Sequence, residues 1–192
     1  MDKDTVVTLL KYKRWIDLAT LQAIRAIDGT VYGEKRHLTI RLMNHIHVVD
    51  MIFRANLRGR PHGYTALNTP ETPTVDALEK AMTACTDEYI QYVSAMTPAD
   101  FHERIAFKFV DGGDGNMTAM EMLNHMLFHG AYHRGAVGWM IGECGGVPPK
   151  EVLTVFLRDH HSCGCETISR ESRGGSAEVQ PDDEYGFSGT GR

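Results

Sequence analysis

The chain has 192 residues, of which 42% are hydrophobic and 23% charged, and its formal net charge is −5. This size predicts one globular domain, and the acidic balance argues against nucleic acid as a partner, because phosphate binding needs a concentrated basic face. No apolar run is long enough for a membrane helix, and the charged start MDKDTVVTLLKYKRW lacks the apolar centre of a signal peptide. We therefore expect a cytoplasmic protein without a membrane partner, whose four cysteines are reduced thiols.

Apolar residues recur at helical spacing in four long segments, at about residues 4–27, 37–57, 72–96 and 117–143. Thr72 and Pro73 predict the start of the third helix, as a hydroxyl cap followed by proline at the first helical position. Asn116 is a candidate cap for the fourth helix, and Gly145-Gly146 marks its exit.

Between the third and fourth helices, Ile105, Phe107 and Phe109 alternate with other residues before a Gly-Gly-Asp-Gly turn, which predicts a short hairpin or an ordered loop. Pro148-Pro149 is expected to open a short fifth helix, KEVLTVFLRDH. Four long amphipathic helices without a strand-rich half predict an all-α protein, an antiparallel four-helix bundle in residues 1–158. The long loop at residues 58–72 predicts a non-simple connection between the second and third helices.

Residues 159–192 form a polar C-terminal tail by composition. We expect this tail to lie extended across the bundle or a partner subunit, anchored by Tyr185 and Phe187, its only aromatic residues. The segment HHSCGC offers soft metal ligands, but Cys163 and Cys165 are spaced more tightly than in usual zinc sites. A solvated segment is therefore favoured over a redox pair or an auxiliary metal site.

Three histidines of the fourth helix, His125, His129 and His133, form two overlapping pairs at four-residue spacing. Such pairs lie on one helix face and can converge on one ion, although ten histidines in the chain also produce them by chance. Helical phase puts His129 and His133 at the apolar stripe of the helix. A buried histidine needs partners for both ring nitrogens, and a metal ion with a hydrogen-bond acceptor would supply them.

The second helix contributes His45 or His47. His45 shares a helix face with the apolar residues Leu38, Leu42, Val49 and Ile52. His47 shares a face with Met43, Asp50, Met51 and Arg54, of which Asp50 and Arg54 are charged. His45 is therefore predicted to point inward and His47 outward. Three imidazoles from two helices, with positions left for water, are typical of a catalytic zinc-type site. A zinc protease is excluded, because Gly130 stands where its helix carries the general-base glutamate.

The segments NHIHVVDMIF (44–53), HMLFHGAYHRGAVGWMI (125–141) and GVPPKEVLTVFLRD resemble the DinB/YfiT-like four-helix-bundle metalloproteins over roughly residues 1–158. The resemblance implies a metal ion among His45, His129 and His133, with His47 and His125 not bound to it. Tyr132 stands where family members often have His.

The resemblance also implies one divalent metal ion, most often zinc or nickel and sometimes iron. It suggests transfer of a low-molecular-weight thiol to an electrophile, or hydrolysis of an amide-like adduct. We therefore expect a metal-dependent thiol transferase or hydrolase that acts on a small molecule. The alternative is a non-catalytic metal- or ligand-binding bundle that works through protein partners.

Asp50, Tyr132 and Arg134 are the candidate catalytic residues. Asp50 matches a family aspartate and is a candidate hydrogen-bond acceptor behind the metal, a partner of Arg134, or a surface carboxylate. Tyr132 orients substrate or, more in keeping with general burial tendencies, is a packed aromatic residue. Arg134 pairs with a carboxylate inside the bundle or binds an anionic group of the substrate. A homodimer is expected, because closed dimers are the commonest oligomers and bury leftover apolar faces.

Overall fold

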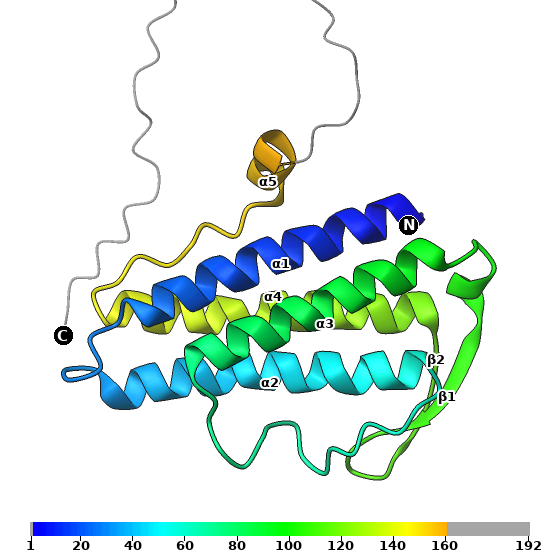
Figure 1. Cartoon of the computed structure of the whole chain (residues 1–192), viewed down its shortest axis with the longest axis horizontal. Coiled ribbons are helices and arrows are strands. Elements are labelled where there is room, and N and C mark those ends of the chain that lie inside the picture. Colours follow the sequence, from blue (N-terminus) through cyan, green and yellow to red (C-terminus); the bar gives the residue numbers. More distant parts are fainter. Residues whose placement is uncertain (1, 161–192) are drawn as a thin grey trace, which may run out of the picture. The chain divides into compact units, whose positions relative to one another are not determined.

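The computed structural model describes residues 2–160, and four long helices of this part form a bundle (Figure 1). The predicted all-α fold is confirmed. The expectations for Cys163, Cys165, Tyr185 and Phe187 lie outside the described residues. None of the helices in residues 2–160 combines the length and the apolar character that crossing a membrane requires.

The elements are α1 (Lys3–Arg25), α2 (Gly33–Leu57), α3 (Val75–Ala95), the 3-10 turn η1 (Asp100–His102), β1 (Arg104–Lys108), β2 (Asp114–Thr118), α4 (Ala119–Glu143) and α5 (Leu153–His160).

Hydroxyl caps start α3 and α4, but at other residues than predicted. The Thr74 hydroxyl accepts a hydrogen bond from the Ala77 amide at 3.1 Å, so α3 begins after Thr74 and not at Thr72-Pro73. Thr118 and Glu121 form a reciprocal capping box at the start of α4. Asn116 cannot serve as this cap, because it pairs with Ala106 in the β1–β2 hairpin.

The starts of α2 and α5 also differ from the prediction. α2 already begins at Gly33, and the Glu34 carboxylate in its first turn stabilises the helix by interacting with the positive end of its dipole. α5 begins at Leu153 and not directly after Pro149, because the segment before it turns tightly, with the Val152 amide donating to the Lys150 carbonyl at 3.0 Å.

The connection from α2 to α3 is the predicted non-simple one. In Figure 1, α1 and α4 run in one direction, and α2 and α3 run in the opposite direction. Because α2 and α3 are parallel, the chain must return along the whole of α2, whose 25 residues span about 37 Å. Residues 58–74 make this return. α1 packs mainly against α3 and α4, and α2 packs against the same two helices, so α1 and α2 occupy opposite corners of the bundle.

The apolar core is divided in two. One cluster lies around Leu10, Val49, Phe53 and Met126, and a second lies around Leu21, Met43 and Val137, among other residues. Between the two clusters, α1 and α4 carry charged side chains that are nevertheless buried, namely Lys13, Asp17 and Arg134, while His129 and His133 beside them are half-buried.

A network of ion pairs fills this polar layer. Lys13 Nζ donates to Asp17 Oδ2 and to Asp50 Oδ2, both at 2.7 Å. Burial opposes the lysine charge, but the two carboxylates outweigh it and raise the pKa of Lys13. Arg134 donates from Nη1 to Asp17 Oδ1 at 2.8 Å, and from Nε and Nη2 to the Glu151 carboxylate at 3.0 and 2.5 Å. The network therefore joins α1, α2, α4 and the segment before α5.

Gly130 leaves the space that the network needs. A Cβ atom at this position would lie 2.7 Å from Arg134 Nη1 and 3.3 Å from Lys13 Cε. Gly135, five residues later on α4, has nothing within 4 Å of the corresponding position and is exposed.

We therefore expect Gly130→Ala and Gly135→Ala to have opposite effects on stability. Alanine is favoured over glycine in a helix by about 1 kcal/mol, so Gly135→Ala should raise the melting temperature by about 2–4 °C. Gly130→Ala should lower it, because the new methyl group displaces the buried guanidinium. Thermal unfolding followed by circular dichroism measures both variants, and an equal rise in both would contradict the close packing at Gly130.

Candidate metal site

Three histidines meet between α2 and α4. Each of His45, His129 and His133 offers a ring nitrogen, and these nitrogens all lie within 4.8 Å of one another. His45 Nε2 is 3.0 Å from His129 Nε2, and the ring centroids of the three residues are 4.5 to 4.8 Å apart. All three side chains are half-buried. The structure thus brings together the three residues that sequence analysis selected, and the group could hold a metal ion.

The two helices fix the directions of these rings. His129 and His133 lie one turn apart on α4, and α2 packs against α4 along its length. Arg134 directly follows His133 and is held by Asp17 and Glu151, so α4 cannot rotate about its axis without breaking buried ion pairs.

The loop after α2 orients His45. The Nδ1 of His45 lies 2.7 Å from the Leu67 carbonyl oxygen, which only accepts, so Nδ1 carries the proton. The lone pair of Nε2 then faces His129, as in metal-binding histidines whose other nitrogen donates to a carbonyl group. Side chains and backbone of α2 hold this loop: Asn44 Nδ2 donates to Thr69 Oγ1 at 2.7 Å, and the Arg41 carbonyl accepts from Asn68 Nδ2 at 3.0 Å. Sequence reasoning missed Leu67, because the contributing group is a backbone carbonyl.

The surroundings keep the α4 histidines neutral. Burial lowers the pKa of His129 to about 3, and the neighbouring His133 and His45 add to this effect. Burial and the adjacent His45 also lower the pKa of His133. Neutral imidazoles at neutral pH are the form that binds a metal ion. His129 Nδ1 is buried and has no hydrogen-bond partner among the described residues.

The predicted outward face of the second helix was wrong, whereas Val49 and Ile52 of the predicted inward face are buried. Met43 and Asp50, assigned to the outward face with His47, are 0% and 3% exposed, whereas Leu38 of the inward face is 50% exposed. His47 is half-buried, and burial lowers its pKa to about 4. The reason is that α2 packs against both α3 and α4, so more than one stripe of this helix is covered. His47 is nevertheless not part of the histidine group.

His125 lies next to the group without joining it. Its ring stacks on Phe53 with 4.7 Å between the centroids, and its centroid is 5.4 Å from that of His129. The residue is exposed. The structure thus selects the second of the two overlapping pairs on α4.

The candidate catalytic residues fall into two groups. Asp50 and Arg134 are buried in the ion-pair network; Asp50 pairs with Lys13 and not with Arg134, and it is not a surface carboxylate. Arg134 takes the expected role inside the bundle and is fully engaged with carboxylates. Tyr132 is 77% exposed, so it is not the packed aromatic residue that burial tendencies favoured. Its ring centroid is 5.1 Å from that of His133, at the rim of the histidine group.

Comparison with known proteins supplies a family. No curated protein and no solved structure matches the chain. The sequence model of the DinB family matches residues 1–162, which include the four long helices, α5 and the three histidines. With the helical bundle and the histidine group on this matched part, the chain belongs to the DinB family.

Proposed function

We propose that His45, His129 and His133 hold one divalent metal ion, and that the chain is a cytoplasmic enzyme that uses this ion to transfer a low-molecular-weight thiol or to hydrolyse a small-molecule adduct. The observation that carries the proposal is the convergence of three imidazoles from two helices, one of them oriented by the Leu67 carbonyl. Family membership supports it.

The donor set fits zinc or nickel first, with iron as a further candidate, because imidazole nitrogen suits all three ions. Three protein ligands leave positions for a substrate, as in catalytic and not in structural zinc sites. A bound ion would act as a Lewis acid that lowers the pKa of a thiol or of water.

The cysteines within residues 2–160 do not offer a nucleophile. Cys85 and Cys144 are both buried, and burial raises the pKa of Cys85 to about 12. A thiol that reacts at the histidine group would therefore come from a small molecule and not from this part of the chain. The exposure of Tyr132 beside His133 supports the proposal that this residue contacts such a molecule.

Replacing His133 with alanine should abolish stoichiometric metal binding, because two remaining imidazoles bind a divalent ion weakly. His47→Ala and His125→Ala are the matched controls on the same two helices and should retain the ion. Elemental analysis of the purified proteins measures the metal content and identifies the metal. Loss of metal in His47→Ala with retention in His133→Ala would exclude the proposed ligand set.

The metal-loaded protein should accelerate the reaction of a cellular thiol with an electrophile such as monobromobimane. Protein treated with a chelator, and the His133→Ala variant, should show only the uncatalysed rate. The assay is run with several cellular thiols and with amide-linked thiol adducts. Full metal occupancy without turnover of any of them would favour the alternative, a metal-binding bundle without catalysis.

We also propose a homodimer. Three large aromatic side chains on α4, Phe128, Tyr132 and Trp139, are 70%, 77% and 74% exposed, and exposed apolar surface of this kind is typical of an interface. Sedimentation velocity at micromolar concentration should show a dimer, and Trp139→Ala should weaken it. A wild-type chain that sediments only as a monomer would contradict this proposal.

A further inference from the structure

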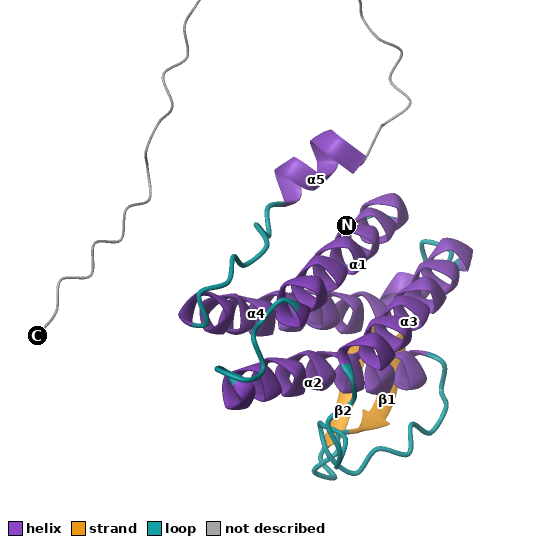
Figure 2. Cartoon of the chain, turned by 60° about the vertical axis from the view of Figure 1, so that its left-hand side comes forward, coloured by secondary structure: helices purple, strands orange, loops and turns teal. Residues whose placement is uncertain are grey.

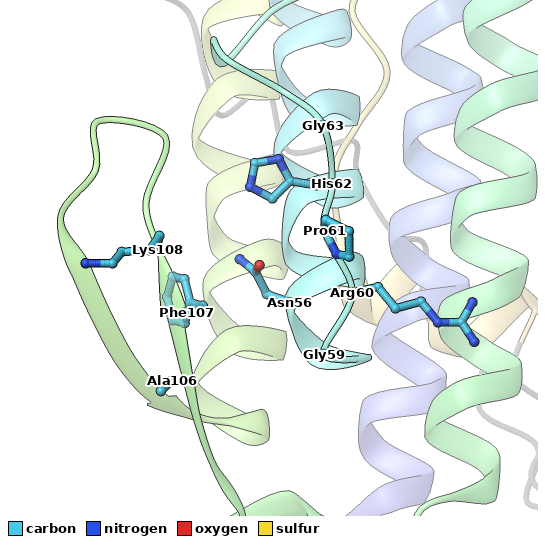
Figure 3. Close-up of a pocket in the computed structure, with 9 residues that line it drawn as sticks. All are labelled: Asn56, Gly59, Arg60, Pro61, His62, Gly63, Ala106, Phe107 and Lys108. Atoms are coloured by element: carbon cyan, nitrogen blue, oxygen red, sulfur yellow. The ribbon is translucent and has the colours of Figure 1, made fainter.

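A second feature lies at the far end of α2. An open pocket of about 360 Å³ is lined by the last turn of α2, residues 59–63 and strand β1 (Figure 3). This volume falls in the range of small-molecule sites. The side chains that line it include Asn56, His62 and Phe107, and none of its lining residues is acidic.

Asn56 presents an unused hydrogen-bond donor. The residue is 8% exposed, and its Nδ2 is covered from solvent without a hydrogen-bond partner among the described residues, so an acceptor reaches this donor when a neighbouring side chain moves aside. In Figure 3 the amide projects from α2 into the space between the loop and the hairpin, between the His62 and Phe107 rings. A buried donor without a partner destabilises the fold, and an acceptor that binds to it would remove this cost.

His62 adds a second donor. Its Nδ1 accepts a hydrogen bond from the Tyr64 amide at 3.0 Å, so the ring proton of the neutral imidazole resides on Nε2. Lys108 pairs with Asp114 at 2.6 Å, and its side chain and that of Arg60 extend away from the pocket in Figure 3. The polar groups inside the pocket are therefore the neutral donors of Asn56 and His62.

Phe107 forms a flat wall. Its ring lies over Gly115 on the paired strand, where a Cβ atom would come within 2.4 Å of the ring. Any side chain at position 115 would therefore displace the Phe107 ring. Donors on one side and an aromatic face on the other favour a planar ligand that accepts hydrogen bonds.

The pocket and the histidine group share one face of α2. Asn56 follows His45 by eleven residues, which is about three helical turns and about 16 Å along the axis. A row of rings links the two places on the α4 side. The ring centroids are 5.4 Å apart for His129 and His125, 4.7 Å for His125 and Phe53, and 6.0 Å for Phe53 and Phe107.

We propose that this pocket binds a small planar carboxylate, whose two oxygens accept hydrogen bonds from Asn56 Nδ2 and His62 Nε2 while its planar part lies against Phe107. It serves as the site for the acidic end of a substrate whose other end reaches the three histidines. This second role rests on the proposed function, whereas carboxylate binding itself does not.

Benzoate is the probe for the binding step. Titration of the full chain, followed by ¹H–¹⁵N NMR, should shift the signals of the Asn56 side-chain amide, His62 and Phe107, with a Kd in the millimolar range. Benzamide, the uncharged analogue, should bind more weakly, because hydrogen bonds to a charged acceptor are stronger. Inorganic phosphate should not compete. Competition by phosphate with the same residue shifts, or no shifts at these residues, would overturn the carboxylate assignment.

Two variants test the donors. Asn56→Leu keeps the volume, removes the unpartnered donor and should weaken benzoate binding at least tenfold while raising the melting temperature. His62→Asn keeps an acceptor for the Tyr64 amide, removes the Nε2 proton and should weaken binding to a similar degree. Asn116→Leu, the same substitution at an exposed position of β2, is the control and should bind benzoate as the wild type does. Unchanged binding in Asn56→Leu and His62→Asn would overturn the proposal.

Carboxylate binding and the role in substrate binding can be tested separately, because only the second requires the metal site. Benzoate should bind the metal-free His133→Ala variant as it binds the wild type, so failure of the proposed function leaves this result intact. In the metal-loaded enzyme, Asn56→Leu should raise KM for a carboxylate-bearing thiol at least tenfold, with kcat within about twofold and the metal content unchanged. An unchanged KM together with lost benzoate binding would overturn the role in substrate binding and leave the pocket as a separate carboxylate site.

Discussion

Lys13 carries a charge in the middle of the bundle, and the rest of the structure is arranged around it. Asp17 and Asp50 neutralise this charge, and Asp17 also binds Arg134, which is held in turn by Glu151. Removing so many charges from water costs free energy that offsets much of their attraction, but the ion pairs still hold α1, α2 and α4 in one arrangement. That arrangement sets the rotation of α4, on which two of the three metal-site histidines lie.

The parallel course of α2 and α3 has a second consequence. It requires a long return loop, and this loop is bound to α2 along its way. The same loop supplies the Leu67 carbonyl that orients His45, and its first residues close the pocket at Asn56. A simple up-and-down bundle with a short turn at this place would have neither feature. The topology of the helices thus creates the chemical surroundings of the site.

The chemistry of the site follows from what surrounds the three histidines. Burial and mutual proximity keep the imidazoles of His129 and His133 neutral, which favours metal binding over proton binding. The cysteines of the described part are buried elsewhere, which favours a thiol supplied by a small molecule. The pocket proposed for a carboxylate, on the same face of α2, would offer a means of selecting that molecule. The two proposals together would describe a substrate with two chemically different ends, a thiol at the histidine group and an acidic group at the pocket.

The amino-acid sequence by itself determined the helical class and the four long segments, because helical periodicity is a local property of the chain. Four-residue spacing left two overlapping histidine pairs on α4, and the resemblance of the sequence to a known family selected His45, His129 and His133. The sequence did not determine the faces of α2, since a helix packed on two neighbours buries more than one stripe, as Met43 and Asp50 show. The partners of Asp50 and Arg134, the role of the Leu67 carbonyl and the pocket at Asn56 all depend on contacts between residues far apart in the chain. Only the tertiary structure decided these, because the packing of the helices and the path of the loop determine which groups meet.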